Sequence, residues 1–327
     1  MIKCRFIAIL ASGLIFVTAA SASAAAQSLN IPTKKWGLSF GNSKEFTGLR
    51  FNFRDSRVRR INGINATLWQ PRKDNKDAVI NGVSLGVIPG GGYLNGLHVG
   101  ILGVAAERSL TGISLGLLGT GAGEDITGIN IGGLGAGAGG SIKGINIGGL
   151  GAGCGKNLKG FNFGGLGVGA GEDVWGITIG GIGAGAGDNM TGLNIGGVGL
   201  GAGKRLAGVN LAGFGLGAGE ELSGVSLAGF AAGSVRVRGL AMAGGFVGGK
   251  DIRGVFIAGA CVHVPRDGRM TGFAASPFNF IKGSQNGVSI GIVNYAWSVK
   301  GAQIGLVNIV RSNPRYLRIL PIFNSSF

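Results

Sequence analysis

The stretch Lys143-Gly-Ile-Asn-Ile-Gly-Gly-Leu-Gly-Ala-Gly-Cys-Gly155 nearly copies the one that ends sixteen residues before it, Thr127-Gly-Ile-Asn-Ile-Gly-Gly-Leu-Gly-Ala-Gly-Ala-Gly139. Its beginning returns as Lys159-Gly-Phe-Asn-Phe-Gly-Gly-Leu-Gly167. A fixed period of this kind indicates a repeat architecture, in which each copy buries its surface against the next. The repeat therefore predicts the architecture of the protein before any single side chain is considered.

Each repeat is anchored by the pattern X-Gly-φ-x-φ, in which φ is an apolar residue. The spacing between anchor glycines is sixteen residues from Gly96 to Gly224 and varies from fourteen to nineteen outside that range. We predict a single glycine-rich repeat domain over residues 27–327, most regular over 96–239. The seventeen anchor glycines are Gly48, Gly63, Gly82, Gly96, Gly112, Gly128, Gly144, Gly160, Gly176, Gly192, Gly208, Gly224, Gly239, Gly254, Gly272, Gly287 and Gly301.

The first 26 residues have the pattern of a secretory signal peptide. Lys3 and Arg5 precede an apolar run over 6–17, and the small residues of 20–26 fit a cleavage site. The apolar run is shorter than the ~20 residues that a membrane-spanning helix needs. We therefore predict a signal peptide at residues 1–26 and an exported mature chain.

The composition excludes two classes of glycine-rich protein. Glycine supplies 71 of the 327 residues, far above the usual share of roughly 7 %. Collagen is excluded because there is no Gly-X-Y period and only 7 prolines are present. Disordered chains are poor in branched apolar residues, whereas Ile, Leu or Val occurs in every repeat. An ordered repeat remains.

The charge of the chain suggests a kind of partner. The formal net charge is +16, and the basic residues are densest between Lys34 and Lys76. Arg57, Arg59 and Arg60 form the tightest cluster, which predicts an anionic partner such as a phosphorylated lipid or an envelope polysaccharide. The alternative interpretation is a solvated polar rim. Nucleic acid is not expected as a partner of an exported chain.

Alternation within the repeat predicts strands. Ile145 and Ile147 share one face of an extended segment, and the glycines around them disfavour a helix. After the pair Gly148-Gly149 the larger residues change parity, which is typical of a bulge or a tight reversal. One repeat is then either one kinked strand or two short strands. In the second case we expect Ile145 and Ile147 to pack on Ala152 and Cys154.

The repeats predict an all-β fold with two possible architectures. The first is a closed, β-barrel-like assembly of about seventeen tandem repeats of ~16 residues, whose strands would be antiparallel. The alternative is a parallel β-solenoid, which would stack equal positions of successive repeats. The direction of neighbouring strands decides between them. A solenoid would form an asparagine ladder from Asn130, Asn146, Asn162, Asn194 and Asn210.

The C-terminus favours the barrel and the outer membrane. We expect a last strand over residues 315–327, in which Phe323 and the terminal Phe327 share one face. This arrangement resembles the insertion signal of outer-membrane barrels. Ser325 and Pro321 depart from that signal. If the chain spans a membrane, a barrel is the only option that pairs every backbone polar group.

Three C-terminal phrases carry a family resemblance: Gly287-Val-Ser-Ile-Gly-Ile-Val-Asn-Tyr295, Gly301-Ala-Gln-Ile-Gly-Leu-Val-Asn-Ile309 and Asn313-Pro-Arg-Tyr-Leu-Arg-Ile-Leu-Pro-Ile-Phe-Asn324. They resemble the uncharacterised bacterial surface-repeat proteins whose units read Gly-φ-Gln-Ile-Gly-φ-φ-Asn. The resemblance covers most of the mature chain. It implies an exported, envelope-associated β-repeat protein and assigns no role to any residue.

The search for reactive groups predicts no catalytic, cofactor or metal site. His98 occupies a position at which other repeats have Asn or Ser, so a polar strand residue is expected. His263 lies near Cys261, but Cys-x-His lacks the four ligands of a structural zinc site. Cys154 replaces an alanine of neighbouring repeats, which predicts a small buried side chain. Residues 244–251 resemble a phosphate-binding loop but end in Asp where Ser or Thr belongs.

These observations predict a non-enzymatic structural or binding protein of the bacterial cell envelope, associated with the outer membrane. The alternative is a secreted or surface β-solenoid that adheres through one flat face. A pore is a narrower version of the barrel hypothesis. If the chain were an enzyme, the interruption of the period over 262–280 is where we expect a site. Membrane lipid or envelope components are the expected partners, and no oligomeric state is predicted.

Overall fold

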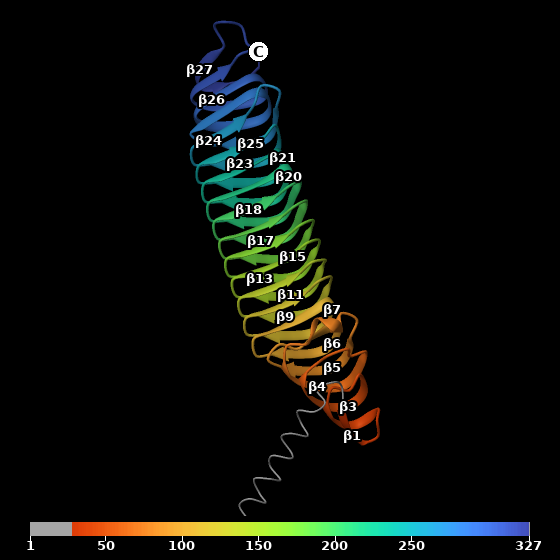
Figure 1. Ribbon diagram of the computed structural model, residues 1–327. Coiled ribbons are helices and arrows are strands. Elements are labelled where there is room, and N and C mark those ends of the chain that lie inside the picture. The colour runs from red at the N-terminus through yellow and green to blue at the C-terminus, as the bar shows by residue number, and fades with distance from the viewer. Residues whose placement is uncertain (1–27, 327) are drawn as a thin grey trace, which may run out of the picture. The chain divides into compact units, whose positions relative to one another are not determined.

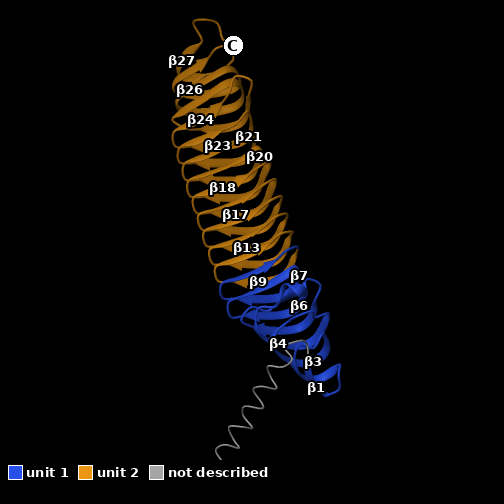
Figure 2. Ribbon diagram, viewed as in Figure 1, with its two compact units in different colours: residues 1–124 blue, residues 125–327 orange. Residues whose placement is uncertain are grey.

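The computed structural model describes residues 28–326. The predicted signal peptide at 1–26 and the terminal Phe327 lie outside these residues. The chain divides into two compact units, residues 1–124 and 125–327 (Figure 2). Strands make up 74 % of the residues that the structure describes, and no α-helix occurs among them. The all-β class is therefore confirmed.

Neighbouring repeats pair in parallel, one repeat apart (Figure 1). Within the second unit, strand β11 (Ile142–Gly148) pairs with β13 (Leu158–Gly164), so that equal positions of the two repeats lie side by side. Parallel direction decides between the two predicted architectures. The alternative, a parallel β-solenoid, is confirmed for both units. The closed barrel required antiparallel neighbours and is not the architecture of residues 28–326.

The first unit begins with a hairpin and continues as a solenoid. Its first two strands are antiparallel, and each later long strand pairs in parallel with the one before it. A short 3₁₀-helix, Lys73–Asn75, lies in the connection between the fourth and fifth strands. The strands are β1 Ser28–Pro32, β2 Trp36–Gly41, β3 Glu45–Arg54, β4 Arg60–Trp69, β5 Val79–Gly86, β6 Gly90–Gly100, β7 Gly103–Gly116 and β8 Gly119–Ala122.

The second unit is more regular, with a long and a short strand in most repeats. Its strands are β9 Ile126–Gly132, β10 Gly135–Ala138, β11 Ile142–Gly148, β12 Gly151–Cys154, β13 Leu158–Gly164, β14 Gly167–Ala170, β15 Val174–Gly180, β16 Gly183–Ala186, β17 Asn189–Gly196, β18 Gly199–Ala202, β19 Arg205–Ala212, β20 Gly215–Ala228, β21 Ala231–Ala243, β22 Phe246–Gly248, β23 Asp251–Ala258, β24 Cys261–Val264, β25 Arg269–Ala275, β26 Phe278–Val310 and β27 Ile319–Asn324. From β9 to β17, long strands pair with long strands and short with short, so each repeat is one coil of the solenoid.

The anchor glycines explain why the period is so strict. All seventeen have positive φ angles, between 93° and 136°, a region that residues with a side chain rarely occupy. A Cβ atom added to Gly160 would lie 2.1 Å from the carbonyl oxygen of Gly144, the anchor of the preceding repeat. No side chain fits at this position, so every coil needs its glycine. Gly37 extends the series by one coil at the N-terminal end.

The faces of the long strands are reversed relative to the prediction. Asn146 and Ala152 are buried inside the coil together with Ile142. Ile145 points outward and is 40 % exposed, so the predicted packing of Ile145 and Ile147 on Ala152 and Cys154 is wrong. Alternation shows which residues share a face but not which face is inside. The narrow interior suits alanine and asparagine, provided that the asparagine amide finds a partner.

The asparagine ladder that the solenoid hypothesis required supplies that partner. The Asn130 Nδ2 donates to Asn146 Oδ1 at 3.1 Å, and the Asn146 Nδ2 donates to Asn162 Oδ1 at 3.0 Å. After an interruption at Thr178, the Asn194 Nδ2 donates to Asn210 Oδ1 at 2.9 Å. These side chains are fully buried. Each bond therefore offsets the cost of removing an amide from water.

The predicted C-terminal strand over 315–327 is shorter in the structure. Strand β27 runs from Ile319 to Asn324 and pairs antiparallel with the end of β26. The hairpin of β1 and β2 occupies the corresponding place at the start of the first unit. Atypical terminal elements of this kind pair the otherwise open edge of the last coil.

The anchor constraint can be tested with two alanine substitutions in the second unit. Gly208 has a φ of +104°, and a Cβ would lie 2.2 Å from the Gly192 carbonyl oxygen. We expect Gly208→Ala to lower the free energy of unfolding by at least about 1–3 kcal/mol, the usual cost of a strained backbone. The matched control is Gly201→Ala, because a Cβ at Gly201 has nothing within 4 Å. Equal midpoints of urea unfolding for the two variants would contradict the constraint.

The first unit contains a second test, at a buried histidine. His98 is a polar strand residue, as expected, but it is fully buried because the faces are reversed, and burial lowers its pKa from 6.5 to about 4. The fold therefore holds the neutral imidazole, while the unfolded chain takes up a proton below pH 6.5. The neutral imidazole therefore contributes to the free energy of unfolding. This contribution is complete above pH 6.5 and is lost as the pH falls towards 4, by about 3 kcal/mol in total.

We expect His98→Asn, which restores the residue type of other repeats, to flatten the stability profile between pH 6.5 and 4. Urea unfolding at a series of pH values measures this. His263→Asn serves as the comparison, because His263 is exposed and the lowering of its pKa by burial and Lys282 is smaller than the lowering at His98. A profile that responds to His263→Asn and not to His98→Asn would overturn the assignment.

Candidate functional site

The second unit presents an exposed apolar face. The residue after each anchor glycine and the residue after each Gly-Gly or Ala-Gly pair point outward, and Ile145 and Leu150 are 40 % and 49 % exposed. Because the coils are in register, each position forms a column. The outermost column contains Leu134, Leu150, Leu166, Ile182, Val198, Phe214 and Phe230. Contiguous apolar surface of this extent marks an interaction site in soluble proteins.

Aromatic residues continue this column. The rings of Phe214 and Phe230 stack with centroids 5.0 Å apart, and Phe246 meets Phe230 edge to face at 5.4 Å. Stacking follows from the parallel register, which places one coil directly beside the next. The side chains of the column are therefore held in a fixed row.

A shallow groove runs across three coils of this face. Its walls include Ile195, Leu211 and Leu227, its floor is formed by the small residues that follow them, and its volume is about 390 Å³. Gly213 cannot carry a side chain, because a Cβ there would lie 1.9 Å from the Gly197 carbonyl oxygen. The face can thus bury apolar groups of a partner. The lining of the groove consists of Ile, Leu, Ala and Gly residues.

The predicted basic cluster is only partly assembled in the first unit. Arg59 and Arg60 line a polar pocket of about 400 Å³ together with Lys35, Glu45 and the strand residues Phe46, Thr47 and Asn62. Arg59 forms an ion pair with Glu45, 3.2 Å between Nη1 and Oε1. Arg57 is not among the residues of this pocket and lies 3.8 Å from Asp74. Lys35, far away in the sequence, joins the pocket because β2 and β3 are neighbours.

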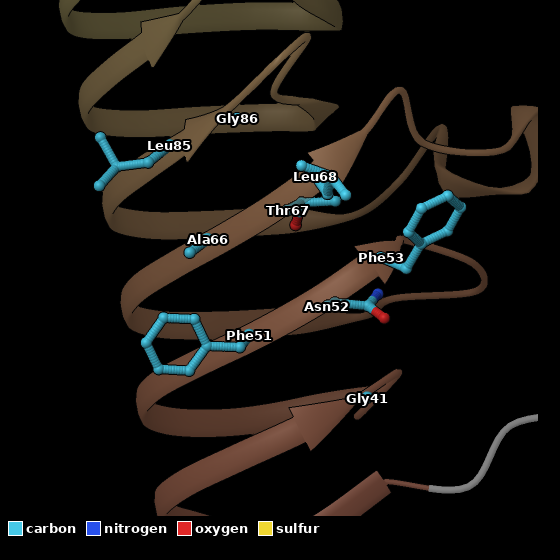
Figure 3. A pocket seen from close by; sticks show the side chains of 9 residues that line it. All are labelled: Gly41, Phe51, Asn52, Phe53, Ala66, Thr67, Leu68, Leu85 and Gly86. Atoms are coloured by element: carbon cyan, nitrogen blue, oxygen red, sulfur yellow. The ribbon is translucent and has the colours of Figure 1, made fainter. Parts of the chain in front are cut away.

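An apolar groove lies at the other end of the same strands (Figure 3). Phe51 and Phe53 of β3, Leu68 of β4 and Leu85 of β5 contribute its large side chains, and its volume is about 630 Å³. The ring of Phe51 also stacks on Phe40, with centroids 5.6 Å apart. The sequence shows alternating apolar residues here, but it does not show which of them face outward.

A buried ion pair takes the place of the asparagine ladder in these first coils. Arg50 and Asp55 are fully buried, with 2.6 Å between Nη1 and Oδ1. Arg50 also donates to Asn65 at 2.6 Å, and Thr67 donates to the second oxygen of Asp55 at 3.1 Å. Removing two charges from water is costly unless they are paired and hydrogen-bonded, as these are. The pair is structural, and sequence reasoning did not find it.

The remaining candidates lie apart from these surfaces. Phe323 is half exposed on β27, and Phe327 is outside the described residues, so the insertion signal stays a prediction. Cys154 and Cys261 are free, and burial raises the pKa of both thiols. Residues 28–326 contain no group of three metal-ligating side chains. No helix in this range is long and apolar enough to cross a membrane.

Comparison of the chain with protein-family models, with curated proteins and with solved structures found no match. The class of the protein, a glycine-rich parallel β-solenoid, therefore follows from its own residues and geometry.

The buried ion pair differs measurably from an exposed one. We expect Arg50→Met to cost about 3–5 kcal/mol of unfolding free energy, because it leaves the Asp55 carboxylate buried without its cation. Arg59→Met, which breaks the exposed pair with Glu45, should cost at most ~1 kcal/mol. Urea unfolding monitored by circular dichroism compares the two. Similar losses of unfolding free energy in the two variants would contradict the stabilising role of the buried Arg50–Asp55 pair.

Proposed function

We propose that this protein is a non-enzymatic binding protein of the bacterial cell envelope, which adheres to a lipid surface through the apolar face of its second unit. The single observation that supports this most is the outermost column, whose aliphatic and aromatic side chains remain about half exposed in coil after coil. Contact with another apolar surface would remove these side chains from water and lower the free energy. The face is thus suited to a partner that is itself apolar and extended.

A membrane interface fits this face better than a small soluble ligand. The columns run over many coils, and the groove among them is shallow and about 390 Å³ in volume. A small molecule would cover a few coils and leave the rest exposed. The excess of basic over acidic residues would add attraction to the anionic lipids of a membrane surface. Each half-exposed side chain of the column would contribute on the order of 1 kcal/mol on insertion.

The envelope assignment rests on the sequence. The predicted signal peptide supports export, and the resemblance to bacterial surface-repeat proteins supports the cell surface or the outer membrane as the location. Between the two functions predicted from the sequence, the solenoid that adheres through one flat face is the one that the observed fold favours. The pore depended on a closed barrel and is not proposed.

The proposal is tested by substituting the column without disturbing the core. Leu150, Leu166 and Ile182 lie outside the strands and are about half exposed, so the triple variant Leu150→Ser, Leu166→Ser, Ile182→Ser should fold. We expect it to lose at least about tenfold in binding to phosphatidylcholine vesicles, because three apolar contacts are removed. Flotation of the vesicles with bound protein measures the loss, and circular dichroism verifies the fold.

The matched control carries three substitutions at exposed turn residues, Lys156→Ser, Glu172→Ser and Lys204→Ser. It should bind phosphatidylcholine vesicles as the unsubstituted protein does. Unchanged vesicle binding by the leucine and isoleucine variant would overturn the proposal. So would a result in which that variant loses only self-association, because the face would then serve a second copy of the chain.

A further inference from the structure

We propose that the first unit contains a discrete site for an anionic amphiphile, with the anionic head in the basic pocket and the hydrocarbon chain in the apolar groove. The inference deepens the proposed lipid-binding function and rests on it, since it names a lipid class that one part of the molecule selects. It is carried by two cavities of complementary chemistry that lie along the same strands, β3 and β4.

The strands themselves connect the two cavities. On β3, Thr47 lines the basic pocket and Phe51 lines the apolar groove, four residues further along. On β4, Asn62 and Ala66 stand in the same relation. Four residues of strand span about 13 Å, and residues of equal parity point to the same side. The exposed Ile64 lies between Asn62 and Ala66, so the path from the polar to the apolar end is itself apolar.

The basic pocket has cationic groups that no acid neutralises. Glu45 pairs with Arg59, whereas Lys35 and Arg60 have no ion-pair partner among residues 28–326. Asn62 and Thr47 add hydrogen-bonding groups at the strand end of the pocket. A phosphate or carboxylate head would supply the missing negative charge and accept hydrogen bonds from the guanidinium and ammonium groups.

The apolar groove is suited to a flexible hydrocarbon chain. Phe51, Phe53, Leu68 and Leu85 line it, and Figure 3 shows their side chains on three neighbouring strands. Its volume of about 630 Å³ falls within the usual range for a small-molecule site. The polar side chains among its lining residues, Asn52 and Thr67, are uncharged, and both donate hydrogen bonds to Asp55.

Only a ligand with an anionic head and a hydrocarbon chain can occupy both cavities. A free anion would leave the groove exposed to water, and a neutral lipid would leave Lys35 and Arg60 unpaired. The same chemistry is found in a free alkyl phosphate and in a phospholipid of a bilayer. The experiment therefore needs one arm for each source.

The first arm uses soluble ligands and isothermal titration calorimetry on the full mature chain. We expect dodecyl phosphate, kept below its micelle concentration, to bind at least about tenfold more tightly than inorganic phosphate. Phe53→Ser with Leu68→Ser should lose about tenfold in dodecyl phosphate affinity, since two apolar contacts are removed. Arg60→Gln with Lys35→Gln should lose a similar factor, because two charge-assisted contacts are removed.

The second arm compares vesicles of phosphatidylcholine with vesicles that also contain phosphatidylglycerol. We expect the Arg60→Gln, Lys35→Gln variant to lose about tenfold or more of its preference for the anionic vesicles. The control, Arg57→Gln with Lys73→Gln, removes the same charge in the same unit but outside the pocket. Its preference should fall by less than about threefold, the effect of general attraction being spread over many basic residues.

Three results would overturn the inference: equal losses in the pocket variant and the control, equal affinity for inorganic and dodecyl phosphate, or unchanged dodecyl phosphate affinity in Phe53→Ser, Leu68→Ser. Binding of dodecyl phosphate with no preference for anionic vesicles would assign the site to the free amphiphile. A different result would contradict the proposed function: binding to phosphatidylcholine vesicles that does not change in the Leu150→Ser, Leu166→Ser, Ile182→Ser variant. The calorimetric arm would then still test the site in the first unit.

Discussion

The fold depends on the contact between the anchor glycine of one coil and the carbonyl oxygen of the anchor before it. At Gly160 the space for a Cβ is occupied by the Gly144 oxygen at 2.1 Å. Only glycine tolerates both this approach and the positive φ angle. Since each anchor bears on the preceding one, the contact holds the coils of a unit in register. A shift by one residue would place a side chain against a carbonyl group.

This constraint also accounts for the unusual distribution of polar and apolar residues. The second glycine series, at Gly197, Gly213 and their equivalents, brings backbone atoms of neighbouring coils equally close. What remains inside is a narrow space filled by one large apolar side chain before the anchor, an apolar side chain of the short strand that is alanine in several coils, and a polar side chain that is often asparagine. The amides pair along the stack. The β-branched and aromatic residues after the anchor then have only the outer surface to occupy.

An interior of this kind separates stability from binding. The coils are held together by backbone pairing, the glycine contacts and the amide ladder. The side chains of the outer columns are therefore not needed to fill the core. In the first unit the same outer surface differs from end to end, basic where β3 and β4 begin and apolar where they end. The outer surface is thus apolar in coil after coil of the second unit, whereas in the first unit it has a basic end and an apolar end.

The amino-acid sequence by itself determined the all-β class, the seventeen anchors and the asparagine positions that would stack, because period and residue type are local properties. It also singled out Arg59 and Arg60. It did not determine strand direction, since a period of sixteen fits a barrel and a solenoid alike. Only the tertiary structure decided that Asn146 faces inward and Ile145 outward, and that Lys35 joins Arg60 in one pocket. Which face is inside, and which distant strands meet, depends on the space that stacked coils leave to each side chain.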